Sequence, residues 1–63
     1  MQVVLTQREK ELMELLVSGK SNLELANEMF VSTHTIKSML EILFRKYNVN
    51  NRVQLAVSYL RGN

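Results

Sequence analysis

The sequence predicts an all-α protein built as a four-helix bundle. Two observations favour helices, and the apolar fraction marks the chain as globular. The chain of 63 residues has no proline and only two glycines, which are the residues least compatible with a helix interior. Its apolar fraction of 46% is ordinary for a globular protein. Between polar stretches, apolar side chains recur every three or four residues, which is the period that gathers them on one side of a helix.

Two capping boxes mark the first two helices. Thr6 with Glu9, and Ser21 with Glu24, have the spacing at which each side chain satisfies a free backbone donor at a helix start. Gly19 suits the left-handed conformation that ends many helices. The predicted buried stripes are Leu12, Leu15 and Leu16 in the first helix, and Leu25, Ala26, Met29 and Phe30 in the second.

The longest helix is predicted at Ser32–Tyr47, with its helical residues from about 33 to 47 and Ser32 as the cap. It has two unlike faces. One face is apolar and is expected in the core, whereas the other is polar and must meet water or a polar partner. The apolar face holds Ile36, Met39, Leu40, Leu43, Phe44 and Tyr47, and the polar face holds His34, Lys37, Ser38, Glu41 and Arg45.

A fourth helix is expected after Asn51, where Asn51 to Gln54 is a third possible capping box. One face would be buried and carries Val53, Ala56, Val57 and Leu60. Leu55 and Tyr59 lie on another side, where a small monomer has little left to cover them, and this predicts self-association. The alternative is that Leu55 packs against residues 1–5 or the first helix.

The second and third helices have the pattern of a helix-turn-helix, so the bundle is predicted to have this motif at its centre. The motif needs a short helix, a tight junction such as Val31-Ser32, and a second helix that crosses the first. Ala26 is small where the two helices would approach. Apolar residues hold the crossing, namely Leu25, Met29, Val31, Ile36 and Met39. An antiparallel helical hairpin would show similar spacing without requiring Ala26.

The charge is unevenly distributed. Residues 1–31 hold three basic and five acidic side chains, a balance of −2, whereas residues 32–63 hold five basic and one acidic, a balance of +4. A basic half that coincides with the exposed helix favours a nucleic-acid partner, because contacts with phosphates release bound counterions. A solvated face is the alternative reading of the same charges.

Several classes of function find no support. The single histidine, His34, has no aspartate to orient it and no cysteine nucleophile to serve, so we expect no enzyme, no cofactor and no metal site. No apolar run approaches the roughly 20 residues of a membrane span and no signal-peptide pattern begins the chain, so a cytoplasmic protein is expected.

Motifs across most of the chain resemble one family, the LuxR/GerE-type helix-turn-helix DNA-binding domain found in NarL/FixJ-type response regulators. The resemblance implies bacterial transcription control, with double-stranded DNA and RNA polymerase as partners. It leaves open whether residues 1–63 are a free-standing domain or the C-terminal domain of a larger regulator with an N-terminal regulatory domain. The motifs are Leu5–Glu9, Gly19, Asn22–Ala26, Phe30–Ser32, Thr35–Lys37, Arg45-Lys46 and Asn51–Val53.

The resemblance also implies roles for residues of the third helix. Lys37 matches the position whose cation reaches base edges, where lysine can donate to guanine O6 and N7. Ser38 and Glu41 occupy the other base-facing positions. Here the sequence departs from the family, which often has Asn-His after the lysine and a basic or neutral residue in place of Glu41. The family also pairs through its last helix, which implies a homodimer through Leu55 and Tyr59.

Phosphate contacts are expected from both ends of the third helix, because such contacts set the register on DNA without reading sequence. The candidates are Ser32, Thr33 and Thr35 at its start, and Arg45 and Lys46 at its end. Ser32 could instead serve only as a cap, and the two cations could instead form a solvated helix end. The rival overall function is a protein-interaction module without DNA binding, which would use Leu23, Glu41, Leu55 and Tyr59.

Overall fold

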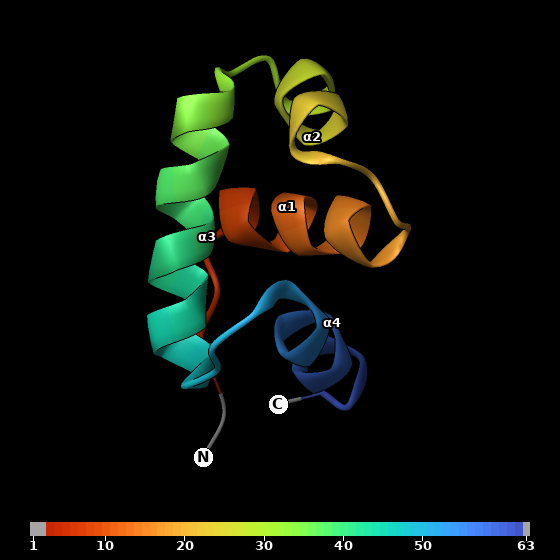
Figure 1. The fold of residues 1–63 in the computed structure, drawn as a ribbon. Helices are drawn as coiled ribbons and strands as arrows, with labels where there is room; N and C mark the ends of the chain where they lie inside the picture. Colours follow the sequence, from red (N-terminus) through yellow and green to blue (C-terminus); the bar gives the residue numbers. More distant parts are fainter. Residues whose placement is uncertain (1–2, 63) are drawn as a thin grey trace.

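The computed structural model describes residues 3–62, and within them it contains four helices and no strand. These are α1 (Gln7–Val17), α2 (Asn22–Met29), α3 (Thr33–Tyr47) and α4 (Arg52–Leu60). Figure 1 shows α3 along one side of the molecule, with α2, α1 and α4 lying in that order along its inner side. The predicted all-α fold is confirmed. No helix in residues 3–62 is long and apolar enough to cross a membrane.

The first two capping boxes form as predicted. Thr6 Oγ1 accepts from the Glu9 amide at 3.1 Å, and Glu9 Oε1 accepts from the Thr6 amide at 2.9 Å. Ser21 and Glu24 make the same reciprocal pair at 3.2 and 2.8 Å. Both boxes satisfy donors that the first turn of a helix leaves free, so the starts of α1 and α2 are determined locally.

The third capping box is only half formed. Asn51 Oδ1 accepts from the Gln54 amide at 2.9 Å, so Asn51 caps α4 as expected. The Gln54 side chain, however, accepts from the amide of Asn50 at 3.1 Å and not from that of Asn51. The start of α4 is nevertheless where the sequence predicts it.

The core takes residues from all four helices, and α2 packs on both α1 and α3. Ala26 is almost completely buried, which fits the close approach expected of a small residue at this crossing. In Figure 1 α2 crosses the upper end of α3, as a helix-turn-helix requires. The buried apolar residues are Leu12, Met13, Leu16, Leu25, Ala26, Met29, Ile36, Leu40, Leu43 and Leu55.

The predicted faces of α4 are partly wrong: Ala56 packs against the core as expected, but three other residues of the predicted buried face, Val53, Val57 and Leu60, are exposed. Leu55 is fully buried, with 0% of its surface exposed, whereas Val53 and Leu60 are 72% and 70% exposed. The expectation that Leu55 lies uncovered and can form a dimer contact is therefore wrong, because the core of a single chain already covers it. Tyr59 is half-buried on the same inner side, and its hydroxyl donates a hydrogen bond to Glu14 of α1.

The predicted place of Phe30 in the buried stripe of α2 is also wrong. Phe30 is the residue that ends α2, with φ 59° and ψ 43°, and its side chain is 93% exposed. The left-handed conformation turns the chain out of the helix, so the side chain no longer follows the buried period of Leu25, Ala26 and Met29. Val31, the next residue, returns to the core surface.

Candidate nucleic-acid interface

The outer face of α3 carries polar side chains that are not used by the fold. Lys37, Ser38 and Glu41 are all exposed, and within residues 3–62 no side-chain hydrogen bond or ion pair engages any of them. The opposite face of the same helix is buried through Ile36, Leu40 and Leu43. The three predicted base-reading residues are thus brought together on one surface, which is free to meet a partner.

The start of α3 is held by its own hydroxyl groups. Ser32 Oγ accepts from the Thr35 amide at 3.1 Å, and the two hydroxyl oxygens lie 3.1 Å apart in a further hydrogen bond. Ser32 therefore caps the helix, which is one of its two expected roles. Thr33 is exposed beside it, and Thr35 is half-buried.

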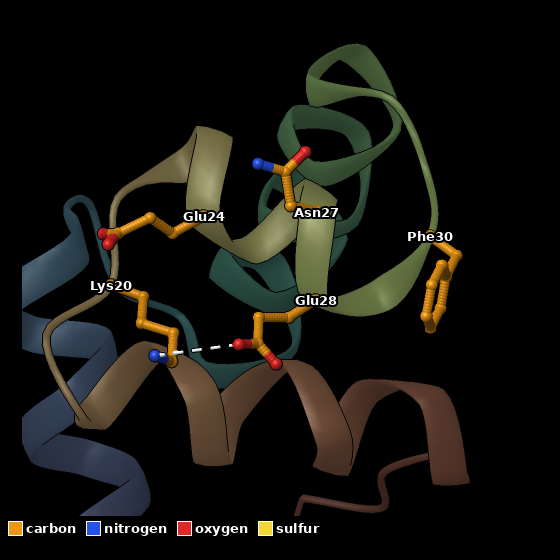
Figure 2. A pocket seen from close by; sticks show the side chains of 5 residues that line it. All are labelled: Lys20, Glu24, Asn27, Glu28 and Phe30. Atoms are coloured by element: carbon orange, nitrogen blue, oxygen red, sulfur yellow. Dashed lines mark ion pairs between the residues drawn. The ribbon is translucent and has the colours of Figure 1, made fainter.

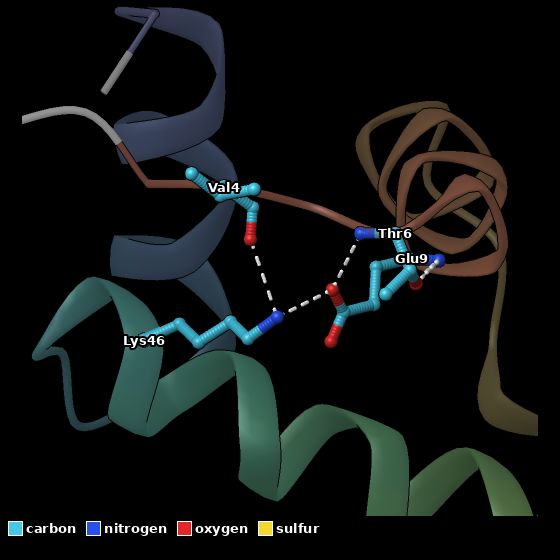
Figure 3. Close-up of polar contacts among 4 residues, drawn as sticks. All are labelled: Val4, Thr6, Glu9 and Lys46. Atoms are coloured by element: carbon cyan, nitrogen blue, oxygen red, sulfur yellow. Dashed lines mark hydrogen bonds and ion pairs between the residues drawn. The ribbon is translucent and has the colours of Figure 1, made fainter.

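Two neighbouring cations at the end of α3, Arg45 and Lys46, have different surroundings. Arg45 is exposed and has no ion pair within residues 3–62. Lys46 reaches across to α1 and the segment before it (Figure 3): its Nζ lies 2.7 Å from Glu9 Oε1 and donates to the Val4 carbonyl at 3.2 Å. The Lys46 ammonium is therefore engaged by α1 and by the segment before it, and a phosphate contact from this side chain stays a prediction.

Glu9 shows the electrostatic effect of this arrangement. Its side chain is only 11% exposed, and burial alone would raise its pKa. The hydrogen bond from Lys46, with those from Thr6, outweighs that effect and holds the pKa of Glu9 below its usual value of 4.5. A carboxylate that was expected only to cap α1 therefore also joins α1 to the end of α3.

Two arginines hold the helix-turn-helix in place, and sequence reasoning gave neither this role. Arg8 Nη2 donates to the Met29 carbonyl at the end of α2, at 3.2 Å. Arg52 at the start of α4 donates to Asn22 Oδ1 at 2.7 Å and to the Lys20 carbonyl. Both lie within motifs that carry the family resemblance, but no local pattern identifies partners 21 to 32 positions away.

A shallow recess of about 290 Å³ is lined in part by two of the predicted base-reading residues, Lys37 and Glu41. It joins the starts of α2 and α4 to α3, so the anchored Arg52 forms part of its wall. Apolar groups and charged groups therefore meet on the same surface as Lys37 and Glu41. The lining residues are Asn22, Lys37, Leu40, Glu41, Phe44 and Arg52.

Comparison with known proteins agrees with this geometry. A regulator from Salmonella typhimurium described as a probable csgAB operon transcriptional regulatory protein is 47% identical over 60 residues, covering 95% of this chain. The spore germination protein GerE of Bacillus subtilis is 40% identical over 58 residues, covering 92% of this chain and 78% of GerE. The chain spans only 27% of the Salmonella protein.

The family model for bacterial regulatory proteins of the luxR family matches residues 3–59. This range contains all four helices except the last residue of α4. It also contains the outer face of α3 described above. The chain therefore belongs to the LuxR family of bacterial regulatory proteins, whose GerE-type domain binds DNA to regulate transcription.

Proposed function

We propose that this domain binds double-stranded DNA sequence-specifically, with α3 in the major groove. The observation that carries the proposal is the free outer face of α3, where Lys37, Ser38 and Glu41 lie exposed and unengaged while the rest of the helix is anchored. A major groove about 12 Å wide admits one α-helix, and a rigid helix presents its side chains to base edges in a fixed register. The domain is a binding module, not an enzyme.

The base contacts follow from the chemistry of the three side chains. Lys37 donates to guanine O6 and N7, and Glu41 accepts from cytosine N4. Ser38 can donate or accept, so it discriminates less strongly. We infer that a preferred site contains a guanine opposite Lys37, whose loss would cost about 1–3 kcal/mol of discrimination.

Phosphate contacts set the position of α3 along the groove. Thr33 and the first-turn amides, beside the Ser32 and Thr35 hydroxyls, suit a phosphate near the start of the helix. Arg45 suits one near its end, since its guanidinium is exposed and has no acidic partner in residues 3–62. Lys46 contributes indirectly, because it holds the end of α3 against Glu9.

The domain is proposed to act as a homodimer through α4, with a different set of residues from those first expected. Val53, Val57 and Leu60 are exposed and follow each other at helical spacing of four and three residues. A symmetric contact between two such stripes would cover them and place two copies of α3 about one turn of DNA apart. Val57→Glu is expected to abolish pairing in sedimentation analysis while leaving the helical content unchanged.

The wider role follows from the relatives. The Salmonella relative is described as an operon transcriptional regulatory protein, and most of its length lies outside the matched region. We infer that this domain supplies the DNA-binding step of transcription control in the bacterial cytoplasm. An N-terminal regulatory domain and RNA polymerase are the further partners that this role would require.

The test is fluorescence anisotropy with labelled duplex DNA at low and near-physiological salt. Wild-type binding should weaken steeply with salt, because cations displace counterions from phosphates. Lys37→Ala should weaken binding and relax sequence preference at one position. Lys10→Ala is the matched control, since it removes the same charge from an exposed position on α1. Equal losses in both variants, or no binding at low salt, would contradict the proposal.

The rival function is a protein-interaction module without DNA binding. Two of the four residues that it would use are already committed within the chain, because Leu55 is buried and Tyr59 is bonded to Glu14. It predicts association that salt leaves unchanged, whereas DNA binding predicts the opposite. The anisotropy experiment therefore separates the two functions.

A further inference from the structure

Phe30 stands at a backbone position that does not suit it. Its φ of 59° lies in the left-handed region, which is unfavourable for residues with a bulky side chain. The other positive-φ residues within 3–62 are Gly19, Asn48 and Gly62, and glycine and asparagine are the types that tolerate this conformation best. The chain thus follows the usual preference at three such positions and departs from it at one.

Packing of the Phe30 side chain does not offset this unfavourable backbone conformation. The Phe30 side chain is 93% exposed, so it contributes nothing to the core that a smaller residue would lose. Glycine here would relieve the backbone and remove an exposed aromatic ring. An unfavourable backbone conformation that carries an exposed aromatic group points to a role in binding, because neither local geometry nor packing accounts for it.

The surroundings of Phe30 indicate what it would bind. Phe30 lies at one end of a recess of about 470 Å³ beside α2, lined also by Lys20, Glu24, Asn27 and Glu28 (Figure 2). Glu24 and Glu28 are exposed, and the single cation, Lys20, lies 3.9 Å from Glu28. Glu24 Oε1 also accepts from the Ser21 amide in the capping box, but its carboxylate keeps its charge. Two carboxylates therefore face one lysine, so the surface is acidic and disfavours phosphate groups.

A guanidinium group matches this combination. It pairs with carboxylates through a planar set of donors, and it stacks on aromatic faces. The recess is lined by residues of α2 and of the loops on either side of it, and by none of the three exposed residues on the outer face of α3. We propose that the acidic–aromatic surface formed by Glu24, Asn27, Glu28 and Phe30 docks an arginine-bearing segment of a partner protein.

This surface differs from the DNA-binding face in position and in the sign of its charge. The docking proposed for the acidic–aromatic surface does not depend on DNA binding by α3. Opposite charges on the two sides would let one domain hold DNA and a basic protein segment at once. The acidic surface would repel DNA, and the basic outer face of α3 would repel the basic segment, so neither partner would occupy the site of the other.

The test is an NMR titration of the ¹⁵N-labelled 63-residue protein with the peptide acetyl-Arg-Leu-Arg-amide. Saturable amide shifts are expected within residues 20–31. Phe30→Gly should weaken binding about fivefold, the effect of losing one cation–π contact. Its melting temperature should not fall, because glycine suits the left-handed conformation. Glu28→Gln should also weaken binding, whereas Glu41→Gln is the matched control on α3 and should not.

Four outcomes would overturn the proposal. These are the absence of saturable shifts at millimolar peptide, equal binding by Phe30→Gly, equal weakening by Glu28→Gln and Glu41→Gln, and equal shifts with acetyl-Glu-Leu-Glu-amide. Adding duplex DNA supplies a further check, because shifts centred on residues 24–30 would mean that DNA occupies this surface. Phe30→Gly should bind DNA as the wild type does, so failure of this proposal is distinguishable from failure of the DNA-binding function.

Discussion

Replacing Lys46 with methionine should destabilise the domain without removing a DNA contact. The Lys46 Nζ lies 2.7 Å from Glu9 Oε1 and 3.2 Å from the Val4 carbonyl. The side chains of Glu9 and Lys46 are 11% and 34% exposed. Methionine retains most of the aliphatic stem, so Lys46→Met mainly deletes the charge and leaves Glu9 partly buried without its cation.

The loss in free energy of unfolding that we expect from Lys46→Met lies between two limits. Removing one partner of a buried ion pair costs about 3–5 kcal/mol, whereas an exposed pair contributes about 0–1 kcal/mol. Because a third of Lys46 is in solvent, we expect a loss of about 1–2 kcal/mol. A domain of this size has roughly 3–9 kcal/mol of total stability, and a loss of about 1–2 kcal/mol should lower the melting temperature by about 8–15 °C.

Urea unfolding followed by circular dichroism measures this loss, and anisotropy over a range of salt concentrations measures the DNA contact. Arg45→Met is the matched control, as it removes the adjacent exposed cation. Arg45→Met should reduce the slope of log affinity against log salt concentration by about 1. It should lower the free energy of unfolding by only about 0.5 kcal/mol, through the lost interaction with the helix dipole. The reasoning is refuted if Lys46→Met lowers the salt slope and leaves stability unchanged.

Further predictions concern pH and the two faces of α4. Burial alone would raise the pKa of Glu9, but its hydrogen bonds hold the pKa below 4.5. The stability that ionised Glu9 contributes is therefore complete above pH 4.5 and is lost as the pH falls through the folded-state pKa. Glu9→Gln should flatten this loss of stability at low pH, measured by urea unfolding. The hydrogen bond to Glu14, with burial, raises the pKa of Tyr59 to about 12, so its contribution is complete below pH 10 and is lost as the pH rises through about 12. Glu14→Ala should return the tyrosinate absorbance transition of Tyr59 toward pH 10. Leu55→Ala should cost about 2–5 kcal/mol in urea unfolding, and Val57→Ala about 0.5 kcal/mol, whereas equal losses would contradict their assigned faces.

Local signals predicted most of the fold. Thr6 with Glu9, and Ser21 with Glu24, act within one helical turn, so their spacing alone places two helix starts. The crossing of α2 and α3 was also predictable, because Ala26 and its apolar neighbours leave few other ways to cover both helices. The polar face of α3 followed from the same period, which is why its three base-reading candidates do lie together.

The faces of α4 could not be predicted in the same way. The helix has apolar residues on two sides, so periodicity offered two stripes and no basis for choosing between them. Distant contacts make the choice: Arg52 binds the loop before α2 through the Lys20 carbonyl, and Tyr59 bonds to Glu14. Phe30 posed a similar difficulty, because its apolar side chain continued the period of α2 up to the residue where the backbone leaves the helix.

The pairing of distant charges also changes the argument for DNA binding. The balance of +4 in residues 32–63 counts five cations, but Lys46 and Arg52 are bonded within the fold. On α3 this leaves Lys37 and Arg45, each four residues from Glu41 and therefore on neighbouring turns of the same helix. The carboxylate offsets part of their attraction to phosphates, so non-specific affinity should be modest. Discrimination between sequences must then depend more on base contacts by Lys37 and Glu41. Glu41→Gln should therefore raise the affinity for all duplexes and reduce the difference in affinity between the preferred site and other sequences.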